Sequence, residues 1–459
     1  MYILLLIVFS ADITGCGKYG EAGGIAHPDQ VVAIDGGSGQ SEPAEGQESG
    51  SGQIASAEGQ NASESQGDSS LQNSTTDLES DTGETPDNSG STALNDAEDE
   101  QITPVPVSPE MNIEDWIMTH SLEEKIAQMF IVTPEAIGGD TALAAAGPEL
   151  EQGIVKYPVG GFIYFAHNLQ SPVQTSGMLD TTKDYYTSNG FIPPFISVDE
   201  EGGTVARIAN NPAFGVANMG PMMNVGATGD VNVAAYAGTY LSAYLKSLGF
   251  NMDMAPVADV YTNPSNTVIG NRAFGSDPYL VAEMVVAEMA AMRAGGVIPV
   301  VKHFPGHGAT EADSHYGYAS TASTLDELLA CELVPFDSAV RSGCQCIMAG
   351  HISAPNVTGS EVPATLSSYM LTSVLRNRLG FRGVIITDAM NMGAVTNQYD
   401  SATAAILSIN AGADVILMPV DFYAAYNGVL QAVNSGVISE ERINESVRRI
   451  LELKKNFII

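Results

Sequence analysis

Short runs of apolar residues recur between residues 129 and 418 and alternate with segments of helical periodicity. Eight runs have the length and the β-branched content of buried strands, and they predict strands at 129–132, 161–165, 195–199, 251–260, 297–303, 346–351, 384–388 and 414–418. Helices are predicted between them, for example at 231–248, 278–294, 324–342, 367–379 and 421–435. Continuous apolar strands that alternate with helices are typical of a parallel sheet covered on both faces.

Eight strand repeats predict an α/β fold of the (β/α)8 (TIM) barrel type for residues 109–459. An open, doubly wound sheet is the structural alternative, but no G-x-G-x-x-G motif follows a strand. A barrel of this type has its active site at the carboxyl ends of its strands. Polar residues at those ends are therefore the first candidates for chemistry.

The region before the predicted barrel has a different composition. Residues 20–108 are rich in Gly, Ser, Glu, Gln, Asn and Asp, and they contain 18 acidic residues with no Lys or Arg. This segment has no apolar periodicity and cannot bury enough apolar surface to offset chain entropy. We therefore expect a disordered acidic linker.

Residues 1–19 resemble an export signal. An apolar run at 3–9 is followed by small residues and by Ile13-Thr-Gly-Cys16, which resembles a bacterial lipobox. Cys16 would then carry the lipid, and two acyl chains are sufficient for stable anchoring. We expect an extracytoplasmic protein that is anchored by lipid to the outer face of the bacterial cell membrane, or secreted.

The charge excludes several partners. The chain has 18 Lys+Arg against 54 Asp+Glu, a formal net charge of −36, and half of this charge lies in the linker. Nucleic acid is not an expected partner, because phosphate binding requires a basic face. The only expected contact with a membrane is through the lipid anchor.

Five predicted strands end in charged or imidazole side chains. The richest end is the loop Lys302-His-Phe-Pro-Gly-His-Gly308, which continues through Asp313 and His315 and holds three of the seven histidines of the chain. Asp313 and His315 are separated by one residue, so that their side chains can meet in a turn. An Asp that accepts the imidazole N–H raises the histidine pKa, which suits a proton shuttle near neutrality.

This loop and five other segments resemble glycoside hydrolase family 3, most closely its β-N-acetylhexosaminidase branch, whose loop reads K-H-F-P-G-H-G followed by D-S-H. The resemblance covers essentially all of residues 120–459. The matching segments, in chain order, are 121–130, 198–203, 255–259, 268–275, 302–315 and 386–390.

The resemblance implies a retaining exo-β-N-acetylglucosaminidase that removes terminal β-linked GlcNAc from peptidoglycan fragments or related glycans. Asp388 matches the catalytic nucleophile, His315 the general acid/base and Asp313 its orienting partner. Most glycosidases use two carboxylates instead. The residues that match sugar-binding positions are Asp199, Arg207, Arg272, Lys302 and His303. No cofactor or metal is implied.

Three alternatives remain open. A phosphorylase would pass the sugar to phosphate, and a neutral histidine at the acid/base position would repel that anion less than a carboxylate would. Another β-glycosidase activity of the family is also compatible with the motifs. A surface lipoprotein that only binds glycans is the alternative without catalysis. A zinc site at His303, His307, Asp313 and His315 is disfavoured, because Lys302 would lie next to the cation.

Overall fold

Parallel strands form the centre of the structure, a computed structural model that describes residues 111–139, 142–310 and 319–459. The strands of this parallel arrangement are β1 (Phe130–Val132), β2 (Gly161–Tyr164), β3 (Phe195–Val198), β6 (Met252–Asp253), β7 (Ile298–Pro299), β8 (Val301–Phe304), β10 (Cys346–Ala349), β12 (Val384–Thr387) and β13 (Ile416–Leu417). Two short additions are the hairpin β4 (Glu200–Gly202) with β5 (Val205–Ala206), and the pair β9 (Ala319–Ser320) with β11 (Ile352–Ser353).

Hydrogen bonds organise these strands into two parallel sheets, in the orders β13-β1-β2-β3-β6-β7 and β12-β10-β8. Two parallel bridges continue the pattern, one between Ile386 and Val415 and one between Val257 and Lys302. Only Val300 separates β7 from β8. The pairings confirm an α/β fold built on parallel strands, and they connect the strands in the order that a (β/α)8 barrel requires.

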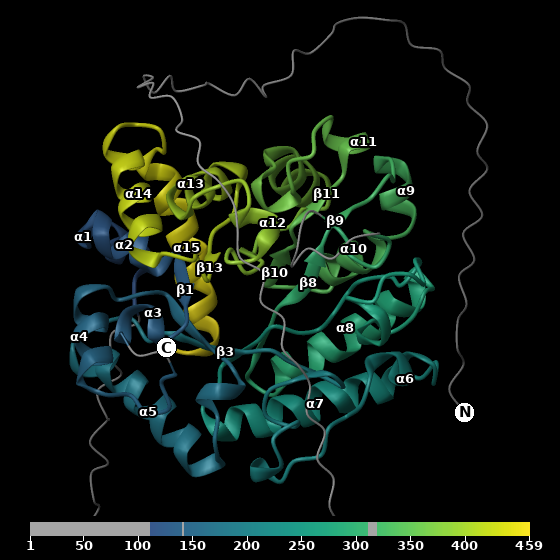
Figure 1. Cartoon of the computed structure of the whole chain (residues 1–459), viewed down its shortest axis with the longest axis horizontal. Helices are drawn as coiled ribbons and strands as arrows, with labels where there is room; N and C mark the ends of the chain where they lie inside the picture. Colours follow the sequence, from purple (N-terminus) through teal and green to yellow (C-terminus); the bar gives the residue numbers. More distant parts are fainter. Residues whose placement is uncertain (1–110, 140–141, 311–318) are drawn as a thin grey trace, which may run out of the picture. The chain divides into compact units, whose positions relative to one another are not determined.

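Helices surround the strands (Figure 1). They are α1 (Ile113–Thr119), α2 (Leu122–Gln128), α3 (Glu135–Gly138), α4 (Pro148–Lys156), α5 (Pro172–Ser188), α6 (Met222–Gly226), α7 (Val231–Leu248), α8 (Pro278–Ala294), α9 (Leu325–Ala330), α10 (Val334–Arg341), α11 (Pro355–Thr358), α12 (Gly393–Thr396), α13 (Ser401–Ala411), α14 (Phe422–Asn434) and α15 (Glu440–Phe457). Short 3-10 helices are η1 (Ala166–Asn168), η2 (Pro212–Phe214), η3 (Gly270–Arg272) and η4 (Ala364–Leu366), and η5 (Tyr369–Arg378) is a π-helix. Within the described ranges, none of these helices is long and apolar enough to cross a membrane.

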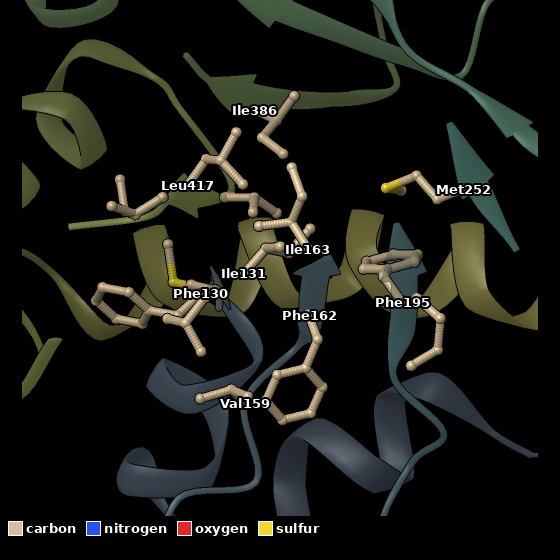
Figure 2. Packing of buried hydrophobic residues seen from close by; sticks show 14 of the residues in the cluster. Phe130, Ile131, Val159, Phe162, Ile163, Phe195, Met252, Ile386 and Leu417 are labelled. Carbon is tan, nitrogen blue, oxygen red and sulfur yellow. The ribbon is translucent and has the colours of Figure 1, made fainter. Parts of the chain in front are cut away.

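Side chains of the strands form the centre of the main hydrophobic core. Ile131, Ile163, Ile386 and Leu417 gather between the strands in Figure 2, and each is at most 2% exposed. Burial of this apolar surface is the dominant favourable contribution to folding. It also fixes the carboxyl ends of the strands, from which the polar residues of the candidate site project.

Several predicted elements are confirmed and others need correction. The predicted strand 297–303 is interrupted at Val300, and the predicted helix 367–379 is the π-helix η5. Helices α7 and α8 have the predicted bounds, and Asp277 accepts hydrogen bonds from two N–H groups of the first turn of α8. The predicted helix 324–342 is instead two helices, α9 and α10, with Pro335 in the first turn of α10, where its missing N–H costs nothing. The predicted strand 251–260 is regular only at β6, since Pro256 has no N–H for a ladder hydrogen bond.

Candidate active site

A cavity of about 340 Å³ lies at the carboxyl ends of the strands. Its wall combines charged and apolar side chains from strands β2, β3, β8, β10, β12 and β13 and from the connections that follow them. The lining residues are Ile163, Phe165, Asp199, Glu201, Val205, Arg207, Val268, Arg272, Lys302, His303, His307, Met348, Asp388, Ala389, Asn391, Met392, Leu417 and Met418. All six predicted site residues that the structure describes therefore line one cavity.

Lys302 lies at the centre of the charged wall. Its Nζ is 2.9 Å from Asp199 Oδ1 and 2.6 Å from Glu201 Oε1, and its side chain is only 3% exposed. Arg272 donates from Nε and Nη2 to the two oxygens of Glu201, each at 2.8 Å, which is the bidentate geometry of strong charge-assisted pairs. Two cations and two carboxylates thus form one hydrogen-bonded cluster.

The cluster fixes the charge state of its members. Burial alone would raise the pKa of Glu201, but Arg272 and Lys302 outweigh burial and hold that pKa far below its ordinary value. Burial would lower the pKa of Lys302, whereas Asp199 and Glu201 raise it above the ordinary value. Glu201 is therefore an anion and Lys302 a cation at neutral pH, and neither can donate and recover a proton during turnover.

Arg207 follows the hairpin β4–β5 and lies at the edge of the cavity. Its Nη2 is 3.6 Å from Asp199 Oδ2, and its guanidinium lies over the Phe165 ring, 5.6 Å from the centroid. The Nε of Arg207 is buried and has no hydrogen-bond partner among the residues that the structure describes. The guanidinium is thus available to an oxygen-rich ligand at this edge.

His303 is oriented by Asp259. Asp259 Oδ2 is 2.7 Å from His303 Nδ1, and Asp259 Oδ1 accepts the His303 and His307 backbone N–H groups at 3.3 and 2.6 Å. Burial raises the pKa of Asp259, but its interactions with His303 and His307 together outweigh burial, so that the pKa lies below the ordinary value. The Nε2 of His303 lies 3.5 Å from Arg272 Nη2. Asp259 therefore fixes both the ring of His303 and the start of the loop that follows β8.

Asp388 comes directly after β12 and is only partly accessible. Its N–H donates to the Ala349 carbonyl at 2.8 Å, and its Oδ1 accepts the Ala389 N–H at 2.8 Å. Burial raises the pKa of Asp388, but His351, His303, the Ala389 N–H and Lys302 together lower it below its ordinary value. Asp388 is therefore ionised at neutral pH and faces a cationic wall.

Three predicted residues lie outside the described ranges: Asp313 and His315 in segment 311–318, and Cys16 in the N-terminal segment. Their roles stay predictions. Among the residues that the structure describes, no three His, Cys, Asp or Glu side chains are grouped as metal ligands.

The site residues predicted from the sequence do not include Glu201 and Asp259. Glu201 nevertheless lines the cavity and binds two cations. Asp259 does not line the cavity, but it orients the ring of His303, which does. The sequence signal that could have identified both acids is their position, since each follows an apolar strand run.

Comparisons with known proteins show the family of the chain. The family model for the glycosyl hydrolase family 3 N-terminal domain matches residues 121–453. Beta-hexosaminidase A of Pseudoalteromonas piscicida is 34% identical over 337 residues, which cover 68% of this chain and 56% of that protein. Beta-hexosaminidase LpqI of Mycobacterium tuberculosis is 32% identical over 343 residues, which cover 73% of this chain and 83% of that protein.

Solved structures show the same relationship. A family 3 beta-N-acetylglucosaminidase from Paenibacillus sp. FPU-7 has a TM-score of 0.70 and 35% identity, over 74% of this chain and 63% of that one. The M. tuberculosis LpqI structure has a TM-score of 0.66 and 29% identity, over 75% of this chain and 97% of that one. The fold and the cavity define a barrel-type glycosidase. The chain belongs to glycoside hydrolase family 3, and it spans little more than half of the Pseudoalteromonas relative.

Proposed function

We propose that the chain is a retaining exo-β-N-acetylglucosaminidase with Asp388 as nucleophile. The observation that carries the proposal is an ionised carboxylate at the base of a small cavity, held by the Ala389 N–H and surrounded by imidazoles and Lys302. An anion is required to attack the anomeric carbon. The cavity volume lies at the lower end of the usual range for ligand pockets, about 300–1,000 Å³, which suits a single terminal sugar ring.

The proton donor is assigned to His315 with Asp313. A leaving glycosidic oxygen needs an acid, which later acts as base toward water. In the part of the cavity that the structure describes, Glu201 is held as an anion, and Asp199 forms ion pairs with Lys302 and Arg207. Glu201 therefore carries no proton to donate at neutral pH, and the dyad on the loop after β8 fits the requirement.

The sugar specificity rests on relatives. The β-hexosaminidases and the β-N-acetylglucosaminidase structure support terminal β-GlcNAc as the sugar removed. Asp199, Arg207, Arg272, Lys302 and His303 supply charged donors and acceptors for its hydroxyl and amide groups. Peptidoglycan fragments are the proposed source, because a lipid anchor at Cys16 and an extended linker would hold the enzyme near a cell wall.

Substitution of the nucleophile tests the function. Asp388→Ala should abolish turnover of an aryl β-GlcNAc, since no group remains to form the glycosyl-enzyme. Asp184→Ala, an exposed Asp of α5, is the matched control and should keep wild-type turnover. Full activity of the Asp388 variant would contradict the assignment. Formation of a sugar 1-phosphate in phosphate buffer would identify a phosphorylase instead.

A further inference from the structure

His351 is a buried histidine directly behind the proposed nucleophile. It follows β10 by one residue, is 0% exposed and does not line the cavity. β10 pairs with β12 in register up to Ala349 and Thr387, so that the residues after these two strands are neighbours. His351 therefore cannot touch a sugar in the cavity, but it is close to the residues that carry the nucleophile.

Both ring nitrogens of His351 face hydrogen-bond acceptors. Nε2 is 3.0 Å from the Ala389 carbonyl oxygen, which can only accept. Nδ1 is 2.8 Å from Thr365 Oγ1, and that hydroxyl donates its own proton to the Gly350 carbonyl at 2.8 Å. A hydroxyl that already donates can only accept from the ring. A histidine that donates from both nitrogens is an imidazolium.

We infer that His351 is a positively charged positioning residue, held by Thr365 and the Ala389 carbonyl, that orients and stabilises the ionised Asp388. Ala389 is the link in this arrangement. Its carbonyl is held by His351, and its N–H donates to Asp388 Oδ1 at 2.8 Å. The inference rests on the proposed function, because it assigns His351 to the nucleophile of that reaction.

The charges around Asp388 agree with this role. Among the residues that the structure describes, the groups that face it are His351 after β10, Lys302 and His303 on β8, and His307 in the next loop. Burial raises the pKa of Asp388, and His351 is the strongest of the opposing contributions. Loss of the His351 charge should therefore make Asp388 easier to protonate.

The test is the acid limb of the pH profile of kcat/KM with an aryl β-GlcNAc. His351→Gln keeps a donor for Ala389 but removes the charge, and Thr365→Val removes the acceptor of Nδ1–H. Both should move the limb to higher pH by about one unit, the lower end of the effect of a nearby opposite charge. Thr365→Ser retains the hydroxyl and should keep the limb at the wild-type position.

Controls separate the outcomes. His120→Gln, at a half-buried histidine stacked on Trp116, should leave the profile unchanged. Equal loss of kcat/KM at every pH in His351→Gln and Thr365→Val, with an unmoved limb, would overturn the inference and show a role in packing alone. If Asp388→Ala keeps its activity, the proposed function fails instead. Thr365→Val replaces one side chain by another of similar shape, so it provides the answer even if His351→Gln does not fold.

Discussion

The surroundings of two adjacent glutamates after β3 shift their pKa values in opposite directions. Glu201 contacts Arg272 and Lys302, which hold its pKa well below the ordinary value despite burial. Burial raises the pKa of Glu200, although Ile208 and Ala209 N–H groups and the Tyr244 hydroxyl donate to it. The sequence gives no means to distinguish the two acids. Only the partners that the fold brings to each one separate their roles.

Glu288 on α8 is a buried acid outside the cavity. Neither of its carboxyl oxygens has a hydrogen-bond partner in the described part of the chain, and burial, with a smaller effect of Glu201, raises its pKa to about 8. The folded state therefore prefers the neutral acid. Its contribution to stability is fully present below the unfolded pKa near 4.5 and is lost as the pH rises toward 8.

Glu288→Gln should remove this pH dependence. At pH 5 the variant and the wild type should unfold with similar free energies, and at pH 8 the variant should be more stable by roughly 2–4 kcal/mol. Denaturant unfolding at both pH values measures the difference. Glu283→Gln, an exposed glutamate of the same helix, is the control and should show no such trend. An equal effect of Glu288→Gln at both pH values would contradict the account.

The sequence predicts elements well where local signals dominate. Helices α7 and α8 have clear caps at Asp230 and Asp277 and match their predicted bounds. The hairpin β4–β5 has no apolar alternation and was not predicted, although it lies between Asp199 and Arg207 and carries Glu201. The cluster of Asp199, Glu201, Arg272 and Lys302 depends on long-range contacts, so a single sequence predicts three of its members but neither Glu201 nor the pairing.

The close packing of helices α7 and α8 can be tested by substituting Gly238, which lies at their contact. A Cβ at Gly238 would lie 2.4 Å from the Glu288 carbonyl oxygen and 3.1 Å from the Ala291 Cβ. Gly238→Ala should therefore destabilise the fold by roughly 1–3 kcal/mol, the usual cost of overpacking. Thermal unfolding and denaturant titration measure this change.

Gly177 is the matched control for Gly238. It lies in α5, and a Cβ there would meet no atom within 4 Å. Gly177→Ala should stabilise the fold by roughly 0.5–1 kcal/mol, because alanine loses less chain entropy in a helix. If both alanine variants were equally stable, close approach of α7 and α8 would not constrain position 238.

The net charge is unevenly distributed along the chain. Half of the net charge of −36 belongs to residues 20–108, and the family match begins only at residue 121. The proposed enzyme therefore separates catalysis from attachment along the sequence.

Cys16→Ser tests the proposed attachment. The variant should move from the membrane fraction to the soluble fraction, because serine cannot receive the thioether-linked lipid, while kcat/KM of the soluble enzyme stays at the wild-type value. Fractionation of the bacterial host, with activity as the readout, measures both. Cys331→Ser serves as the control, and it should remain in the membrane fraction. Equal fractionation of Cys16→Ser and wild type would rule out a lipid at Cys16.

The central claim is that Asp388 is the nucleophile. It is tested most directly by identifying the residue that carries the sugar in a trapped intermediate. The enzyme would be inactivated with a fluorinated GlcNAc donor that slows deglycosylation, then digested and mapped by mass spectrometry. We predict one glycosylated peptide, with the sugar on Asp388. A sugar on another residue, or hydrolysis with an inverted product and no covalent adduct, would contradict the account.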